Sequence, residues 1–177
     1  MRINNKRALI LDSAFQVVEL HGARHLTIDA VAATSGVSKG GVLYHFSTKA
    51  DLLSAMLQYL IEVNRSRVDE YQGEHPSSNK LSALIQAREH MTEAERRASL
   101  ALLAAAAEEP DLLSSAGDQI AQMFEEATDG CSDKNIAAIF FLANEGLRFL
   151  DLLGLNPIAE DETSSLVRYL SETAETI

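Results

Sequence analysis

The chain has 177 residues, a formal net charge of -11 and one cysteine, and 46% of its residues are hydrophobic. A chain of this length can bury a sizeable core, as one domain or as two small ones. The single Cys131 excludes an internal disulfide, so we expect a reduced, cytoplasmic setting. The polar N-terminus predicts no signal peptide, and the most apolar run, Leu100 to Ala107, is too short to span a bilayer, so no membrane partner is expected.

The first predicted helix runs from Asn4 to Leu20, where apolar residues recur at intervals of three and four, and Gly22 ends it. We expect it to pack on the elements that follow and complete a three-helix unit. Lys6 and Arg7 near its start could reach phosphates, but solubility explains these surface charges equally well.

Two short helices joined by a tight turn are predicted next. Thr27 can cap the first, because its hydroxyl can accept unpaired backbone N–H groups of the first turn. Gly36 lies where this helix must end, since glycine adopts a positive φ without a steric penalty. Ser38 can cap the second helix, whose apolar residues fall four apart on one face. This spacing predicts a helix-turn-helix.

The outward face of the second helix carries small and polar residues, namely Lys39, Gly40, Gly41, Tyr44 and His45. Two adjacent glycines in a helix cost roughly 2 kcal/mol relative to alanines, so something should compensate. In a DNA major groove, the missing side chains would let the helix backbone approach the bases, while the polar residues supply donors. The alternative is that the glycine pair simply forms a loop.

With these residues the sequence resembles the TetR/AcrR family of bacterial transcriptional repressors. The resemblance rests on Gly36 to Phe46, Gly-Val-Ser-Lys-Gly-Gly-Val-Leu-Tyr-His-Phe, with Lys49 and two leucines after it, and covers about residues 6–57. It implies an all-α homodimer with an N-terminal three-helix DNA-binding domain, here residues 1–48. It also implies a C-terminal domain, here residues 49–177, that holds a small-molecule inducer and dimerises.

A longer helix is predicted from Lys49 to about Tyr71, and the resemblance implies that its first turn contacts the DNA backbone. A lysine at a helix start opposes the macrodipole slightly, so an external anion would explain Lys49. A salt bridge to Asp51 or to another nearby acidic residue is the competing explanation. The predicted DNA-binding residues are Thr27, Ser38, Lys39, Gly40, Gly41, Tyr44, His45 and Lys49.

The charge is unevenly distributed along the chain. Residues 1–50 carry six basic and three acidic residues, a net of +3, whereas the remainder has a net charge of -14. Only the basic end gains from displacing counterions at phosphates, so this asymmetry would orient the molecule on DNA. Most individual acidic residues are also explained as parts of solvated helix faces.

Five further helices are predicted after a linker from Gly73 to Asn79. The second of them, from Glu93 to Glu108, carries small and apolar residues on nearly every side, so it should be buried centrally. Ser132 should cap the fourth and Gly154 end it, and Asn156-Pro157 should cap and start the fifth. The predicted spans are Lys80 to Met91, Glu93 to Glu108 stopped by Pro110, Asp111 to Thr128, Ser132 to Leu153, and a last helix bearing Leu166, Val167 and Leu170.

The helix from Ser132 to Leu153 carries two apolar rows and should therefore pack on two sides. One side can face its own core and the other a partner subunit. The resemblance implies that the last two helices form a four-helix bundle with their copies, and such a two-fold dimer would bind a palindromic operator. The predicted interface consists of Phe140, Gly146, Leu150, Leu166 and Leu170.

A ligand pocket in an apolar bundle should combine a few polar groups with large apolar ones. The candidates are Arg88, His90, Met91, Met123, Phe141, Asn144 and Arg148. Each has a plain alternative, since methionines commonly fill cores and Arg148 lies within helical reach of Glu145 and Asp151. The acidic C-terminal domain would favour a cationic inducer.

We therefore predict a repressor that binds double-stranded operator DNA and is released by a small-molecule inducer. One alternative is a regulator of the same fold that a protein partner controls. Another is a helical enzyme using His90 or Cys131, but no GxSxG, phosphate-loop, HExxH or paired-cysteine motif supports it. His21 and His25 lack accompanying carboxylates or cysteines, so no metal and no cofactor are predicted.

Overall fold

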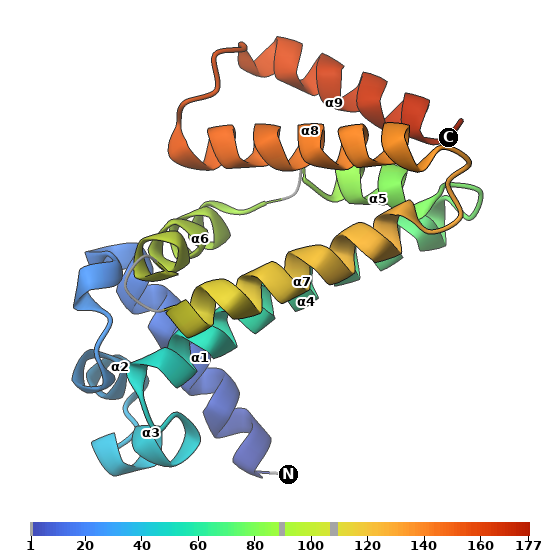
Figure 1. Cartoon of the computed structure of the whole chain (residues 1–177). Helices are drawn as coiled ribbons and strands as arrows, with labels where there is room; N and C mark the ends of the chain where they lie inside the picture. Colours follow the sequence, from blue (N-terminus) through green and yellow to red (C-terminus); the bar gives the residue numbers. More distant parts are fainter. Residues whose placement is uncertain (1, 89–90, 107–109) are drawn as a thin grey trace. The chain divides into compact units, whose positions relative to one another are not determined.

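The computed structural model describes residues 2–88, 91–106 and 110–177, and within them it contains nine α-helices, one short 3₁₀ helix and no strand (Figure 1). The predicted all-α fold class is confirmed. The chain forms two compact units: unit 1 comprises Met1–Ile61 and Thr92–Gly117, and unit 2 comprises Glu62–Met91 and Asp118–Ile177. These units are defined by packing, and the predicted functional domains 1–48 and 49–177 stay a prediction.

Unit 1 is built around the three N-terminal helices, in which α2 packs on both α1 and α3. Its core includes Val31, Val42 and Phe46, all at most 2% exposed. The elements of unit 1 are α1 (Arg2–His21), η1 (Ala23–His25), α2 (Ile28–Ser35), α3 (Lys39–His45), the beginning of α4 (Lys49–Glu74), α6 (Glu93–Ala106) and the beginning of α7 (Pro110–Thr128).

The turn between α2 and α3 forms as the sequence predicts. Thr27 Oγ1 accepts a hydrogen bond from Ala30 N at 3.1 Å, and Ser38 Oγ accepts one from Gly41 N at 3.2 Å. Gly36 has a φ of 66°, in the left-handed region where glycine is favoured. The three predictions of two caps and a glycine stop are thus confirmed.

Unit 2 contains the ends of α4 and α7 together with α5 (Lys80–Ala87), α8 (Lys134–Leu153) and α9 (Glu160–Ala174). Helix α5 packs on both α8 and α9, which lie side by side in Figure 1. A buried hydrogen bond joins Ser82 Oγ of α5 to Ser171 Oγ of α9 at 2.8 Å, within a core that includes Ile85, Phe141 and Val167.

Four predicted helix ends are wrong. Helix α5 ends at Ala87 rather than at Met91. Helix α4 continues to Glu74, through the glycine expected to begin the linker. The cap of α8 is Asp133 rather than Ser132, because Asp133 Oδ1 accepts hydrogen bonds from two backbone N–H groups of the first turn. Helix α9 starts at Glu160, because Asn156 Oδ1 accepts a bond from Ile158 N at 3.0 Å and so turns the chain before the helix begins.

Helix α6 is buried on one face only, which corrects the prediction that it is buried on nearly every side. Ala98, Ala101 and Leu102 are buried, and this helix packs against α1 and η1. Leu103 is 40% exposed, however, so α6 lacks close neighbours on that side within unit 1. Residues 107–109, including the expected helix end at Glu108, lie outside the described residues.

The first turn of α6 carries an ion-pair group. Glu93 accepts hydrogen bonds from Arg96 Nε at 2.8 Å and from Arg97 Nε at 2.9 Å. These hydrogen bonds lower the pKa of Glu93 from 4.5 to about 2. Arg97 also donates through Nη1 to the Glu19 carbonyl at 2.8 Å, one of the last-turn carbonyls of α1 that no helical N–H can reach.

We expect these ion pairs to make stability depend on acid pH. The folded pKa of Glu93 is about 2, below its ordinary 4.5, so the contribution is present above pH 4.5 and is lost as pH falls towards 2. Glu93→Gln should therefore flatten the fall of Tm in this window by a small amount, since the side chains are half exposed. Thermal denaturation followed by circular dichroism measures it, with Asp12→Asn as the control. Parallel pH profiles for the wild type and Glu93→Gln would contradict the assignment.

Candidate functional site

The candidate nucleic-acid interface is the exposed face of α3 together with the first turn of α4. Val42 and Phe46 are buried beneath α3, with exposed fractions of 0% and 2%. Because they fix one side of this seven-residue helix, the opposite side faces outward, and Tyr44 there is 78% exposed. Leu43, which sequence analysis did not select, is also exposed on α3 and could contact a thymine methyl group.

The two glycines of α3 differ in their surroundings. A Cβ added at Gly40 would meet nothing within 4 Å, so the surface above it is open. A Cβ added at Gly41 would lie 2.7 Å from Val37 Cγ1 and 3.3 Å from Ser38 Oγ. The helical conformation removes the alternative that the pair forms a loop. The absence of a side chain at Gly41 therefore allows Val37 to pack against it within the turn. At Gly40, the helix backbone is accessible from outside.

Lys39 is paired with an acidic residue of α2. Its Nζ lies 2.9 Å from Asp29 Oδ1, and the two side chains are 59% and 72% exposed. An ion pair this exposed contributes at most about 1 kcal/mol. The Lys39 ammonium is thus positioned at the surface of the helix-turn-helix without being buried.

Tyr44 and His45 form an edge-on pair at the end of α3. Their ring centroids are 5.1 Å apart, with an interplanar angle of 85°. The Tyr44 ring is the more exposed of the two, since His45 is half-buried. The phenol and the imidazole thus place two hydrogen-bonding groups beside each other on the outward side of the helix.

Thr48 and Asp51 cap the start of α4 reciprocally. Thr48 Oγ1 accepts a hydrogen bond from Asp51 N, and Asp51 Oδ2 accepts one from Thr48 N, both at 3.0 Å. Lys49 lies exposed between them and forms no ion pair with the part of the chain that the structure describes. The competing explanation, a salt bridge from Lys49 to Asp51, is therefore wrong. Sequence analysis missed the role of Thr48, although its spacing to Asp51 is that of a capping box.

The hydroxyls of Thr27 and Ser38 both accept a backbone N–H as helix caps. Each O–H remains a donor, so either could also bind a phosphate oxygen.

Arg7 of α1 lies over the ring of Phe46, with its guanidinium carbon 5.1 Å from the ring centroid. This cation–π contact ties α1 to the end of α3 and gives Arg7 a role beyond solubility.

Unit 2 contains the candidate ligand residues, in contrasting environments. Phe141 is 2% exposed and packs edge-on against Phe124, with ring centroids 5.2 Å apart. Met123 is half-buried and accepts a weak hydrogen bond from Asn64 at 3.8 Å. Arg148 pairs with Glu145 on its own helix, as the plain alternative proposed. Met91 follows α5 as a half-buried residue, and His90 lies outside the described residues.

Two of the ligand candidates have buried atoms without a hydrogen-bond partner. The Arg88 side chain, 8% exposed, forms an ion pair with Asp151, but its Nη1 has no partner among the described residues. Asn144 is 1% exposed, and its Oδ1 likewise has none there. Because buried polar atoms are nearly always hydrogen-bonded, these two atoms distinguish Arg88 and Asn144 from ordinary core residues.

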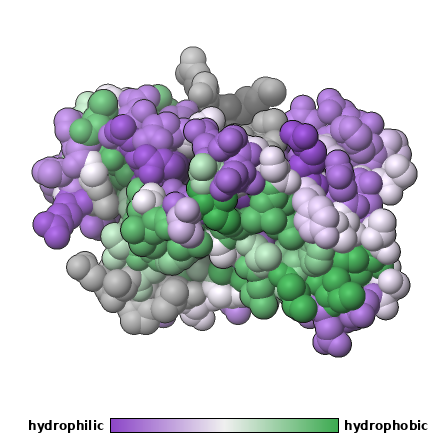
Figure 2. Space-filling model, turned by 90° about the horizontal axis from the view of Figure 1, so that it is seen from above, coloured by the Kyte–Doolittle hydropathy of each residue, from purple (hydrophilic) through white to green (hydrophobic). Residues whose placement is uncertain are grey.

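The apolar row that α8 exposes contains Ile139, Leu142 and Phe149, with exposed fractions of 63%, 66% and 47%. Gly146 belongs to the same row and is also exposed. Seen from above Figure 1, apolar side chains gather into a broad green patch bordered by polar ones (Figure 2). Exposed apolar surface of this kind marks interaction sites.

The remaining predicted interface residues are less accessible than this row. Leu170 is 9% exposed and belongs to the core of unit 2. Phe140 and Leu166 are half-buried and pack against that core, and Leu150 is half-buried. Among the predicted interface residues, Gly146 is thus the one that lies on the exposed row of α8.

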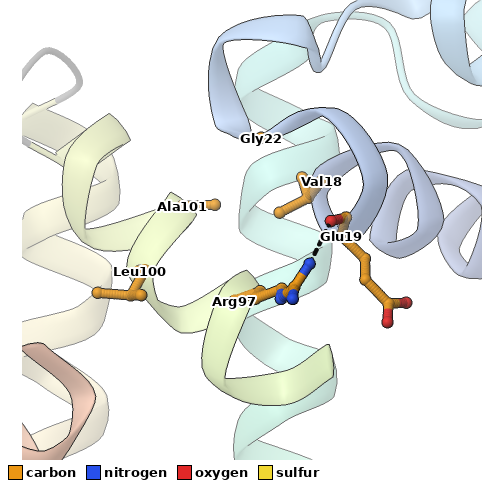
Figure 3. A pocket seen from close by; sticks show the side chains of 6 residues that line it. All are labelled: Val18, Glu19, Gly22, Arg97, Leu100 and Ala101. Atoms are coloured by element: carbon orange, nitrogen blue, oxygen red, sulfur yellow. Dashed lines mark hydrogen bonds between the residues drawn. The ribbon is translucent and has the colours of Figure 1, made fainter. Parts of the chain in front are cut away.

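A hollow of about 330 Å³ lies in unit 1 between the end of α1 and α6 (Figure 3). Arg97 reaches across it to the Glu19 carbonyl, as the dashed line in Figure 3 marks. Its lining residues are Val18, Glu19, Gly22, Arg97, Leu100 and Ala101. Sequence analysis did not select Arg97, because the partner carbonyl lies 78 residues away in the chain.

Within the described ranges, no group of three or more His, Cys, Asp or Glu side chains could hold a metal ion. The same ranges contain no helix that is long and apolar enough to cross a membrane. Cys131 is buried, and its Sγ lies 3.9 Å from the Ala127 carbonyl.

Two family models match the chain. One, described as bacterial regulatory proteins of the tetR family, matches residues 10–56, and the other, described as a tetracyclin repressor-like C-terminal domain, matches residues 78–175. Two curated relatives from Pseudomonas putida, the HTH-type transcriptional regulator SrpR and the uncharacterized regulator TtgW, are each 37% identical over 51 residues. Those residues are 29% of this chain but span only 24% and 38% of the two relatives.

Solved structures of similar fold cover nearly the whole chain. A TetR-family member from Streptomyces coelicolor A3 (SCO1917) has a TM-score of 0.70 and 24% identity, over 93% of this chain and 97% of that one. The multidrug binding protein EbrR complexed with malachite green has a TM-score of 0.69 and 24% identity, over 95% of both chains. At this identity, the likeness shows the shared fold alone.

We expect alanine at the two glycines of α3 to have opposite consequences. Gly40→Ala should stabilise the folded state by up to about 1 kcal/mol, because it favours the helix and meets no neighbour. Gly41→Ala should lose that gain, because its methyl group would collide with Val37. Urea denaturation measures both, each variant serving as control for the other. If α3 enters a groove, Gly40→Ala should also weaken DNA binding despite its greater stability. Equal stability of the two variants would contradict the packing role of Gly41.

Proposed function

The chain belongs to the tetR family of bacterial regulatory proteins, and we propose that it is a repressor that binds a palindromic operator as a homodimer. In this proposal, α3 enters the major groove of double-stranded DNA and the first turn of α4 contacts the backbone. A small molecule bound by unit 2 releases the protein from DNA.

The observation that carries this proposal is the exposed face of α3 and the start of α4. It combines an accessible helix backbone at Gly40, the exposed ring of Tyr44 and Lys49, which forms no ion pair with a described residue. These residues belong to the segment with a net charge of +3 in a chain whose net charge is -11. Together they offer base-edge contacts and at least one phosphate contact on a single surface.

The apolar row on α8 supports the homodimer. A symmetric pair of α8 helices would cover Ile139, Leu142 and Phe149, and the absence of a side chain at Gly146 would allow close approach. A two-fold dimer presents two copies of α3, and half-sites one helical turn apart, about 34 Å, require this symmetry. The palindromic operator follows from the dimer.

Arg88 Nη1 and Asn144 Oδ1, which are buried and have no hydrogen-bond partner within the described ranges, support a ligand in unit 2. A structural relative, EbrR, is a multidrug binding protein solved with malachite green. The protein would have two states, one that binds DNA and one that does not. For release, the ligand has to bind the second state more tightly than the first, since otherwise it shifts no population. A regulator controlled only by a protein partner would have no use for polar atoms buried inside unit 2.

We expect Lys49→Ala to weaken operator binding and to reduce its salt dependence. If Lys49 meets one phosphate, the slope of log K against log salt should fall by about one. Fluorescence anisotropy over a salt series measures the slope, on a duplex that the wild-type protein selects from a random library. Lys80→Ala is the matched control, because Lys80 is also an exposed first residue of a helix but lies in unit 2. A slope that stays at the wild-type value would remove Lys49 from the interface.

We expect a charge on the exposed row of α8 to dissociate the homodimer. Leu142→Glu, or Gly146→Glu, would bury a carboxylate in the interface, and operator affinity should fall with dimerisation because the two half-sites are no longer bound together. Sedimentation velocity reports the assembly. Ile120→Glu is the control, since Ile120 is also exposed in unit 2 but lies on α7. A Leu142→Glu protein that still sediments as a dimer would place the interface elsewhere.

A further inference from the structure

We infer that the ligand of unit 2 is an apolar carboxylic acid or carbonyl compound that also carries an O–H or N–H donor, and that Arg88 and Asn144 bind it. This inference deepens the ligand control proposed above and rests on it. It assigns to two named side chains the chemistry that the bound molecule has to match.

Arg88 provides the donor. Its guanidinium is more than nine-tenths buried, and Nη2 donates to Asp151 Oδ2 while Nη1 has no partner among the described residues. A guanidinium has only donors, so this N–H can be satisfied only by an acceptor. Leaving a buried donor unpaired costs free energy. An acceptor from outside the chain would recover that free energy.

Asn144 provides the acceptor. Its Nδ2 donates to Glu145 Oε1 at 3.3 Å, which fixes the orientation of the amide and leaves Oδ1 as the free atom. Oδ1 is buried and has no partner in the described part of the chain. An amide oxygen only accepts, so the missing group is an O–H or N–H donor.

The two groups lie on one side of α8. Asn144 and Asp151 are seven residues apart, nearly two full turns, so they share a helix face and are about 10 Å apart along the axis. Arg88 is held at the Asp151 end of this face by their ion pair. Phe141 and Leu147, the buried apolar residues of α8 in the same core, lie beside Asn144 in the helical register. The matching ligand is therefore an elongated apolar body with an acceptor at one end and a donor at the other.

The charges around this face disfavour a cation. The two carboxylates that pair with Asn144 and Arg88 are already engaged: Glu145 accepts from Arg148 and Asn144, and Asp151 accepts from Arg88 and Asn156. Asp151 already balances the charge of the Arg88 guanidinium, but Nη1 has no partner among the described residues. This N–H can bind a carboxylate or a carbonyl oxygen, whereas an ammonium offers it no acceptor. We therefore infer that unit 2 prefers an acid or carbonyl ligand in spite of its negative net charge. This differs from the cationic inducer expected from the sequence. The preference also differs from the dyes malachite green and ethidium that EbrR binds.

The experiment is isothermal titration calorimetry of the full chain with 4-hydroxyphenylalkanoates, from the acetate to the pentanoate, as probes. Each carries a carboxylate for Arg88 and a phenol for Asn144. The matched probes are the methyl ethers, which lack the donor, and tyramine, which replaces the carboxylate with an ammonium. We expect at least one acid to bind, its ether to bind about tenfold more weakly, and tyramine more weakly still.

Two variants assign the contacts to the residues. In Asn144→Leu, the acid and its ether should bind equally, because the partner of the phenol is gone. In Arg88→Met, the acid should lose its advantage over tyramine. Asn144→Leu should keep or raise the Tm of the free protein, because an unsatisfied buried group is replaced by an apolar one of similar size. Arg88→Met should also fold, because Asp151 is 42% exposed and keeps its bond from Asn156.

Three results would overturn the inference. They are failure of every acid to bind, equal binding of acid and ether to the wild type, and tighter binding of tyramine. A lower Tm of free Asn144→Leu together with unchanged acid binding would instead assign Oδ1 to an internal water, and would also overturn it. A gel shift with the selected operator, without probe, separates the two proposals. Operator binding without acid binding refutes this inference alone, and acid binding without operator binding refutes the repressor role alone.

Discussion

The burial of Val42 and Phe46 is the constraint on which the proposed DNA-binding surface depends. In this seven-residue helix, burial of Val42 and of the C-cap residue Phe46 four positions later leaves one orientation, so burial determines which side chains face outward. The cation–π contact of Arg7 with Phe46 adds α1 to the same arrangement. The outward orientation of the proposed recognition residues is thus a consequence of core packing.

Signals that act over a few residues could be predicted from the sequence. The caps at Thr27 and Ser38 and the stop at Gly36 were predictable, because each depends on one side chain and the backbone beside it. The helix start predicted at Asn156-Pro157 was wrong, because this local motif is compatible both with a helix start and with a turn that precedes a helix. The distinction between the two glycines of α3 depends on where Val37 packs, which no local pattern contains.

Contacts between distant residues set the limit of prediction in unit 2. The pairing of Arg148 with Glu145 lies within one helical turn and was foreseen, whereas that of Arg88 with Asp151 joins residues 63 apart. Periodicity also showed two apolar rows on α8 but could not say which one faces outward, because both are equally apolar. Phe140 and Leu150 were placed in the interface for this reason, although they are half-buried.

The ion pair between Lys39 and Asp29 has a consequence for the thermodynamics of DNA binding. In the free protein, the Asp29 carboxylate already occupies the place beside Lys39 that a phosphate would take. On contact with DNA, a phosphate would replace the Asp29 carboxylate at this ammonium. Forming this contact would therefore change the salt dependence of DNA binding little. Lys39 would then contribute to the position and discrimination of α3, while the dependence of affinity on ionic strength would come from cations that have no internal counterion.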